Sequence, residues 1–493
     1  MGVGGTYEVC LVGSIPRPSS VSAILPARCA GGLYGGETIG NAMQQLLSVK
    51  GNTLYLEGVS LASIAQTFDT PVFVFSAGYL RHRIAEFTTA FSSHWPTFQL
   101  MPSFKACPMI AIRQILTELG CGCDVFGHGE LEGAVRGGVP PELISVNGSI
   151  KDQALLLRAL RLGARIVIDS PREIHLTNRL AGELGITARV MLRLKPDMSA
   201  LDDRSDFAPD YAIADLTDRI KYGIPSTELA DIVNQWSSLK HIDCIGFHAH
   251  MGRHSKRLHV WREWVRATLS VVGSIEHILS PNESPVINIG GGFASQCDSD
   301  LDVAFRDDPT PELAEWAVVI TEALHEGFAD MKHAADQWTL EVEPGRALHS
   351  DAGLHLTSVC NLKQESGAAS RQWAEVDTSE VFLDLSGVSG DSPMSYRAVS
   401  KASDEQLQVY DVVGMTCNAE MLLLDATMPA LEEGDVIALL PTGAYIEPMA
   451  ANFNALPRPG SVLVDGETAQ LIKRHETIDD VFSRDIALAE NPT

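Results

Sequence analysis

The chain has 493 residues, of which 45% are hydrophobic and 20% charged, and its formal net charge is −26. A chain of this length is expected to form two domains, and the excess of acidic residues argues against nucleic acids and anionic membranes as partners. The nine cysteines are scattered, without a metal-binding pair or a disulfide framework. No apolar run reaches the length of a membrane span and no secretion signal is evident. The sequence therefore predicts a protein of the reducing cytoplasm without a bound metal.

The first two thirds of the chain alternate between strand-like and helix-like segments. Residues 1–38 are rich in Gly, Pro and Ser and are expected to form a flexible extension. Residues 39–71 hold a strand and a helix that are expected to join a β-domain formed later in the chain. Over residues 72–350, seven or eight β-α units in a row predict an α/β fold, the (β/α)8 TIM barrel. Its strands are expected at 72–75, 98–101, 143–146, 165–168, 188–192, 244–247, 286–289 and 338–342.

The pattern changes after residue 350. Short apolar runs separated by turn signals predict a C-terminal β-domain over residues 351–493, a β-sandwich or β-barrel. The chemistry of a TIM barrel takes place at the C-terminal ends of its strands, so motifs at those ends matter most. The expected strands of the β-domain are 381–385, 409–413, 434–440 and 461–464.

One such motif is Glu343-Pro344-Gly345-Arg346, which follows an expected strand. Pro and Gly end the strand sharply, and a carboxylate and a guanidinium leave it on either side. They could hold the two poles of one ligand, a protonated ring nitrogen and a phosphate, as pyridoxal 5'-phosphate (PLP) presents them. The same four residues could also be an ordinary turn with an ion pair.

Three earlier motifs fit the same ligand. Lys105 is either a surface lysine or, at the end of a barrel strand, a buried amine with a depressed pKa that suits a Schiff base. A run of three glycines lets backbone N–H groups approach a phosphate, although it could be a simple turn. His248 and His250 could form a metal pair, but no third ligand is evident nearby, and a ring stacked on a cofactor suits one of them better. The glycines are Gly290, Gly291 and Gly292.

From about residue 41 to residue 465 the chain resembles the PLP-dependent decarboxylases of the alanine-racemase-like fold, the diaminopimelate and ornithine/arginine decarboxylase group. The greatest likeness is to diaminopimelate decarboxylases. The matching motifs occur in the family's order, and together they are specific. They include Phe104-Lys105-Ala106, Cys123-Asp124-Val125, Gly129-Glu130-Leu131, Arg193 with its flanking Leu and Pro, Lys221-Tyr222-Gly223-Ile224 and Gly443-Ala444-Tyr445.

The resemblance implies a role for each matched residue. Lys105 would be the Schiff-base lysine, His250 would stack on the pyridine ring, and Glu343 would meet the ring nitrogen. Cys417 would be supplied across a dimer interface for the protonation step, which implies a homodimer with shared active sites. The other residues implied to bind the cofactor are Asp124, Arg193, which would approach the phosphate, Gly290, Gly291, Gly292, Arg346 and Tyr445.

Several positions depart from the family pattern. Asn418 replaces an acid that would contact a distal ammonium, and Ser392 replaces an arginine that would hold a distal carboxylate. Arg397 follows Tyr396 where ornithine decarboxylases have an aspartate, and Arg253 stands in place of a serine near the phosphate. These changes predict an intact cofactor site with a rebuilt substrate pocket whose ligand has a neutral or anionic tail. Alternatively, Arg397 is simply exposed to solvent and Asn418 is a neutral change.

The sequence therefore predicts a PLP-dependent α-decarboxylase of an amino acid. A glutamate at the ring nitrogen keeps that ring protonated, which favours decarboxylation over racemisation. An ordinary diaminopimelate, lysine or ornithine decarboxylase, or a racemase or other lyase of this fold, remain alternatives. An inactive binding homologue or a cofactor-free barrel enzyme is disfavoured, because Lys105, Arg193, Glu343, Cys417 and Tyr445 are all present.

Overall fold

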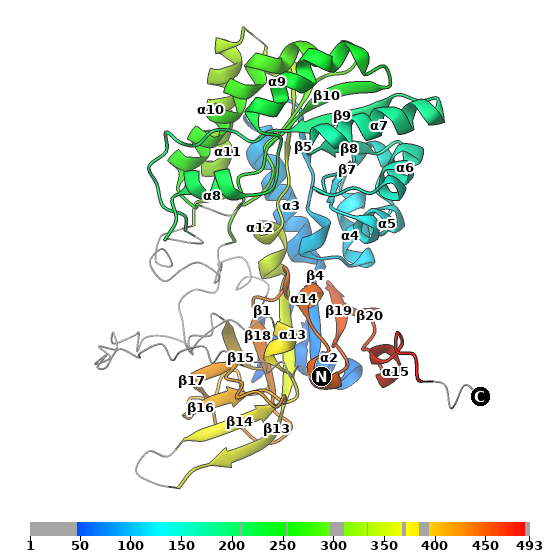
Figure 1. Cartoon of the computed structure of the whole chain (residues 1–493). Coiled ribbons are helices and arrows are strands. Elements are labelled where there is room, and N and C mark those ends of the chain that lie inside the picture. The colour runs from blue at the N-terminus through cyan, green and yellow to red at the C-terminus, as the bar shows by residue number, and fades with distance from the viewer. Residues whose placement is uncertain are drawn as a thin grey trace, which may run out of the picture.

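The computed structural model describes residues 47–206, 210–252, 255–295, 310–332, 334–366, 371–383 and 394–488. Two large sheets organise these residues: one lies among helices in the upper part of Figure 1, and the other forms the lower part. The expected extension at residues 1–38 lies outside the described residues. None of the described helices is long and apolar enough to cross a membrane.

The upper sheet is a closed parallel barrel. Its eight strands follow the order β5-β12-β11-β10-β9-β8-β7-β6. The two ends of this order meet, because Gly122 N donates to Leu100 O (2.9 Å) and Asp124 N donates to Pro102 O (3.3 Å). The predicted TIM barrel is thus confirmed. Its strands are β5 (Phe98–Leu100), β6 (Cys123–Val125), β7 (Ile144–Val146), β8 (Arg165–Ile168), β9 (Ala188–Arg193), β10 (Ile242–His248), β11 (Val286–Asn288) and β12 (Thr339–Val342).

Helices surround the barrel, and their ends follow from local sequence. In α7, Ser170 caps the first turn by accepting from Glu173 N, Pro171 occupies the first helical position, and Gly185 ends the helix at φ 67°. The helices of this part are α3 (Ala77–Ser92), α4 (Ile110–Glu118), α5 (His128–Arg136), α6 (Gln153–Leu162), α7 (Pro171–Leu184), α8 (Ile213–Arg219), α9 (Ser226–Gln235), α10 (Leu258–Ile275), α11 (Leu313–Asp330) and α12 (Arg346–His349).

The lower sheet has nine strands, with β17-β16-β14-β13-β4-β19-β20 as its main path and β18 and β15 branching from β13. Three short strands and a helix precede it in the chain, and their Leu54 and Leu56 share an apolar cluster with Leu354 and Leu356 of β13. The elements are β1 (Leu47–Lys50), β2 (Thr53–Leu56), β3 (Val59–Ser60), α2 (Leu61–Phe68), β4 (Val72–Ser76), β13 (Gly353–Gln364), β14 (Gln372–Val376), α13 (Glu380–Leu383), β15 (Ser395–Ala398), β16 (Leu407–Val413), β17 (Leu423–Pro429), β18 (Val436–Leu440), α14 (Ile446–Met449), β19 (Gly460–Asp465), β20 (Thr468–Lys473) and α15 (Ile478–Val481).

Two expected strands differ from the structure. Strand β4, expected to be the first of the barrel, pairs instead with β13 and β19 in the lower sheet. A fully buried apolar strand has the same pattern in either sheet, so periodicity could not identify its partners. The expected strand at 381–385 is helical over its described part in α13, because Phe382 N donates to Ser379 O (3.0 Å) and closes a turn.

Alternation along the barrel strands separates an outer from an inner face. On β8, Ile166 and Ile168 belong to the large outer core, whereas Val167 belongs to a small separate cluster with Met191, Ile245 and Val286. Arg165, two residues before Val167, is also buried, and its guanidinium meets the Glu341 carboxylate of β12 at 2.6 and 3.1 Å. A two-point ion pair therefore crosses the barrel interior.

Breaking this pair should leave an uncompensated buried charge. We expect Arg165→Met to lower the free energy of unfolding by about 3–5 kcal/mol, measured by urea denaturation. The control is Arg179→Met, which breaks a pair with Glu183 whose two side chains are each 53% exposed and should cost far less. Equal losses in the two variants would show that the internal pair does not stabilise the barrel.

Candidate active site

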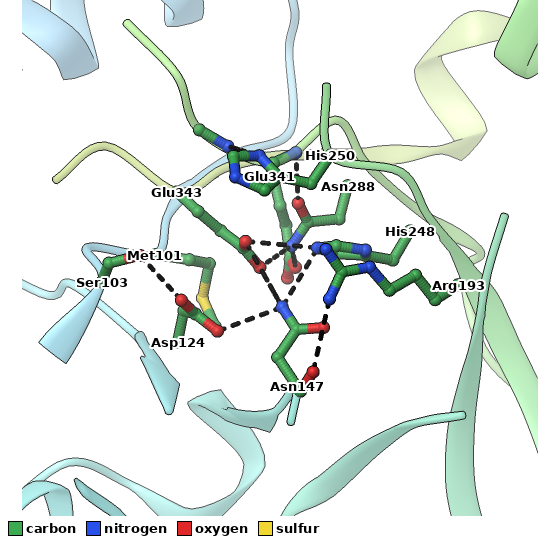
Figure 2. Close-up of polar contacts among 12 residues, drawn as sticks. Met101, Ser103, Asp124, Asn147, Arg193, His248, His250, Asn288, Glu341 and Glu343 are labelled. Carbon is green, nitrogen blue, oxygen red and sulfur yellow. Dashed lines mark hydrogen bonds and ion pairs between the residues drawn. The ribbon is translucent and has the colours of Figure 1, made fainter. Parts of the chain in front are cut away.

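Polar side chains gather at the C-terminal ends of the barrel strands. Because the eight strands are parallel, these ends meet at one mouth of the barrel, and Figure 2 shows many of the side chains pointing toward one another there. They are Lys105 after β5, Asp124 on β6, Asn147 after β7, Asp169 after β8, Arg193 on β9, His248 on β10, Asn288 on β11 and Glu343 after β12.

Lys105 is held by Asp124. Its Nζ lies 3.0 Å from Asp124 Oδ2 and 3.0 Å from Ser103 Oγ. The Asp124 side chain is 2% exposed, whereas that of Lys105 is 41% exposed and therefore open to a ligand. Burial opposes ionisation of the Asp124 carboxyl, but attraction to Lys105 and hydrogen bonds outweigh it and lower its pKa to about 2.

The pKa expected for Lys105 is wrong in direction. Enclosure at the barrel mouth lowers the pKa of this amine, but the opposing attraction of Asp124, Tyr445 and Glu343 is larger, so the net pKa is raised. The sequence offered burial as the cause of a depressed pKa and did not include the carboxylate 3.0 Å away. Without a ligand, Lys105 is therefore an ammonium paired with Asp124.

Glu343 is buried and receives several hydrogen-bond donors. Asn288 Nδ2 donates to its Oε1 at 2.9 Å, Asn147 Nδ2 donates to the same oxygen at 3.1 Å, and His248 Nε2 lies 3.2 Å from its Oε2. Burial, and then the negative charge of Asp124, raise the pKa of Glu343 well above its usual range. Burial and Arg193 lower the pKa of His248 to about 3, so its ring is neutral. A cationic partner would stabilise the ionised form of Glu343.

The glycine loop packs tightly against the site. Gly291 N donates to His250 Nδ1 at 3.0 Å, and Gly290 N donates to Asn288 Oδ1 at 2.8 Å. A Cβ on Gly291 would lie 2.2 Å from Glu343 O, and Gly290 has a φ of 73°. The loop thus requires glycine for close approach and for backbone conformation. The loop therefore contacts both His250 and the end of β12, where Glu343 lies.

Tyr445 brings the lower sheet to the same mouth. It follows β18, and its backbone N donates to Ala106 O at 2.8 Å, next to Lys105. The Arg346 guanidinium lies 5.0 Å from the centre of the Tyr445 ring, and a Cβ on Gly345 would lie 2.3 Å from Tyr445 Oη. Glu343 and Arg346 therefore have different partners on the two sides of their turn.

Arg193 lies beside His248 and Asn147 in Figure 2. Its Nε is 3.7 Å from Asp169 Oδ1, one of its Nη atoms donates to Asn147 O at 3.4 Å, and its guanidinium lies 4.5 Å from the Tyr222 ring centre. Burial lowers the pKa of Arg193. The contact with phosphate expected for this residue stays a prediction.

Two residues expected at the substrate lie on the connection between β16 and β17. Cys417 is exposed, and its Sγ lies 3.4 Å from Asn454 Oδ1. Asn418 Nδ2 donates to Glu380 Oε1 at 2.8 Å. A carboxylate that the sequence reasoning did not consider therefore stands beside the position where the family's acid is replaced.

The other positions expected at the substrate belong to β15 or lie outside the described residues. Tyr396 Oη accepts from Thr427 N at 2.9 Å, and the half-buried Arg397 donates to Tyr396 O at 2.8 Å. Ser392 and Arg253 fall outside the described part of the chain.

Sequence reasoning did not single out Asn147 or Asn288. Both are buried and both contact Glu343. Each stands at the C-terminal end of a short apolar strand, as Asp124 and Glu343 do. That position in a predicted barrel was the signal that could have identified them.

These groups fit PLP. The accessible amine of Lys105 suits the aldehyde, the buried carboxylate of Glu343 suits a protonated ring nitrogen, and the glycine loop and Arg346 suit the phosphate. Fold and site together define a PLP enzyme built on a TIM barrel.

Comparison with known proteins gives the family. Residues 78–350 match the pyridoxal binding domain of the pyridoxal-dependent decarboxylases. The chain belongs to this family and is a PLP-dependent decarboxylase of an amino acid.

Similar proteins cover nearly the whole chain. It is 27% identical to a diaminopimelate decarboxylase of Haemophilus influenzae over 88% of this chain and 97% of that protein. It is 29% identical to that of Bacillus subtilis over 88% of this chain and 95% of that protein. In fold it resembles the crystal structure of diaminopimelate decarboxylase from M. jannaschii, with a TM-score of 0.79, 24% identity and coverage of 91% and 99% of the two chains.

Gly290→Ala should weaken PLP binding. A Cβ there would lie 2.6 Å from His250 Nδ1 in a left-handed backbone, so we expect affinity for PLP to fall at least about tenfold, measured by absorbance titration. The control is Gly185→Ala, which has a φ of +67° but meets nothing within 4 Å. It should cost only about 1 kcal/mol of stability, and a matching loss of PLP affinity in this variant would contradict a specific role for the loop.

Proposed function

We propose that this enzyme removes the α-carboxylate from a diamino-acid-like substrate whose tail is neutral or anionic, for example an N-acylated or carboxylated diamino acid of a specialised pathway. The observation that carries the proposal is Arg397. Its guanidinium is half-buried on β15, and burial lowers its pKa. A cationic tail beside this group would meet an unfavourable charge, whereas a carboxylate or a carbonyl would find a donor.

When bound, PLP supplies the electron sink that accepts the electrons left by the departing carboxylate. The chain supplies the remaining functions. Lys105 would hold the cofactor, with Asp124 orienting its amine. Glu343 would keep the ring nitrogen protonated, and the imidazole of His250 would pack against the cofactor. Cys417 or Lys105 would deliver the proton that replaces carbon dioxide at Cα.

A second candidate is ordinary diaminopimelate, lysine or ornithine decarboxylation. Glu380 favours it, because its carboxylate accepts from Asn418 at 2.8 Å and would offer a distal ammonium an anionic partner near the Cys417 loop. The curated relatives also carry the name diaminopimelate decarboxylase. The two candidates differ in the charge that the substrate's tail presents.

Release of carbon dioxide from a substrate panel separates the candidates. The panel holds meso-diaminopimelate, L- and D-lysine, ornithine, arginine and amino acids with acylated or carboxylated tails. Preference for the last group is expected, and Arg397→Ala should raise KM for an anionic-tailed substrate at least about tenfold, whereas Arg397→Lys should retain part of the binding. Preference for diaminopimelate or lysine, with Arg397→Ala unchanged, would overturn the proposed tail.

We also propose a homodimer in which Cys417 completes the partner's site. Exposed apolar side chains lie near Cys417 or its contact Asn454 in the sequence: Met415, Met421 and Phe453 are between 44% and 49% exposed. The contact of Cys417 with Asn454 joins the two loops that carry them. Apolar surface of this kind favours burial against another chain, and a two-fold contact would bring each loop to the other copy.

Mixing two inactive variants tests the shared site. Lys105→Ala and Cys417→Ala are each expected to lose at least about a hundredfold in turnover. After subunit exchange, half of the dimers would be mixed and would hold one intact site, so about one quarter of wild-type activity should return. Differently tagged subunits verify the exchange by co-purification. Exchange without recovery would place Cys417 in its own chain's site, and an active Cys417→Ala would place it outside the site.

A further inference from the structure

We propose that Asn147 is a positioning residue that ties Asp124, beside the cofactor lysine, to Glu343, beside the ring nitrogen. It does not touch the reacting atoms in this role. The inference rests on the PLP site and not on the identity of the substrate's tail, so it stands whichever amino acid is decarboxylated.

The side-chain nitrogen of Asn147 reaches both carboxylates. Its Nδ2 lies 3.0 Å from Asp124 Oδ1 and 3.1 Å from Glu343 Oε1. The residue is 3% exposed, so water does not compete for these bonds. Figure 2 shows the amide standing between the two acids, with dashed lines to each. One side chain from the end of β7 therefore joins the ends of β6 and β12.

The chemistry of an amide explains why this residue suits the position. Its nitrogen carries two hydrogens, enough for the two carboxylates, with His248 Nε2 a third neighbour at 3.1 Å, and it has no charge of its own. An ionised acid at this site would repel both neighbours, and a hydroxyl has only one hydrogen to donate. The amide oxygen of Asn147 has no hydrogen-bond partner among the described residues. The hydrogen bonds that Nδ2 donates therefore fix the orientation of the side chain.

The backbone of Asn147 is fixed as well. Its N donates to Val125 O of β6 at 2.7 Å, and its O accepts from Arg193 at 3.4 Å. The side chain consequently leaves a rigid point of the barrel. A rigid donor can hold its acceptors in one rotamer, which is the property expected of a positioning group.

The hydrogen bond from Asn147 also fixes the orientation of the Asp124 carboxylate. Asn147 binds Oδ1, while Oδ2 accepts from Lys105 Nζ at 3.0 Å and from Ser103 at 2.7 Å. Holding the first oxygen keeps the second one facing the amine. The other titratable groups that act on Lys105 are Glu343, Tyr445 and His250. Of these, Glu343 also accepts a hydrogen bond from Asn147. A substitution of Asn147 should therefore affect both Asp124 and Glu343.

The test uses two variants that remove both hydrogens, Asn147→Ala, which leaves a cavity, and Asn147→Val, which fills it. The control is Asn288→Ala, because Asn288 also donates to Glu343 (2.9 Å) but has no hydrogen bond to Asp124. Each protein is loaded with PLP, its thermal unfolding confirms that it is folded, and its absorbance spectrum is recorded from pH 6 to pH 10. The midpoint of the spectral change reports the proton on the nitrogen of Lys105 bound to the cofactor.

Both Asn147 variants are expected to lower this midpoint by about one pH unit, because Asp124 is then free to turn away from the lysine. Affinity for PLP should fall about tenfold. Asn288→Ala should leave the midpoint within about 0.2 units of wild type, although turnover falls as Glu343 loses a donor.

A midpoint that is unchanged in Asn147→Val would overturn the proposal, as would an equal shift in Asn288→Ala. If the alanine variant does not fold, the valine variant decides by the same criterion. Neither the spectral midpoint nor the affinity for PLP requires a known substrate. Failure of the proposed tail specificity would therefore leave this test unaffected, and failure here would leave the substrate panel unaffected.

Discussion

The barrel depends on one chain of hydrogen bonds and ion pairs that runs through its interior to the mouth. It begins with a buried guanidinium, passes alternately through carboxylates and amides, and ends at an amine that a ligand can reach. Every link comes from a different strand end or inner strand position, so none can move without disturbing its neighbours. The members, in order, are Arg165, Glu341, Asn288, Glu343, Asn147, Asp124 and Lys105.

Two amides keep the three acids of this chain apart. Asn288 stands between Glu341 and Glu343, and Asn147 stands between Glu343 and Asp124. The outer acids have cations, since Arg165 pairs with Glu341 and Lys105 with Asp124. Among the described residues, the hydrogen-bond partners of Glu343 are two amides and the neutral His248 ring, and burial and the charge of Asp124 raise its pKa. The acid without a direct ion pair to Lys or Arg among the described residues is thus the one that we propose for the protonated ring of PLP.

Strands and helices with a periodic sequence pattern could be predicted from the sequence. The strands and side chains that they contact could not. Repeated β-α units gave the barrel and placed Lys105 and Glu343 at strand ends. The same patterns misplaced β4, since a buried strand does not specify its sheet. They missed Asn147, because an asparagine after a strand is common in turns and shows its role only when two acids converge on it. The predicted direction of the Lys105 pKa shift was wrong for the same reason, because the shift depends on the facing Asp124.

The residues expected to bind the cofactor and those expected to bind the substrate's tail come mainly from different sheets, so a change at the second set would leave the first set in place. The groups that fit the cofactor come mainly from barrel strand ends and are linked by buried hydrogen bonds. Asn418 and Arg397, which are expected to meet the substrate's tail, lie on a loop and a strand of the lower sheet. Loops outside such a network tolerate substitution more readily than its members. Departures from the family pattern at these positions therefore leave the network from Arg165 to Lys105 intact, and Tyr445, bonded to Ala106, keeps the two parts in register.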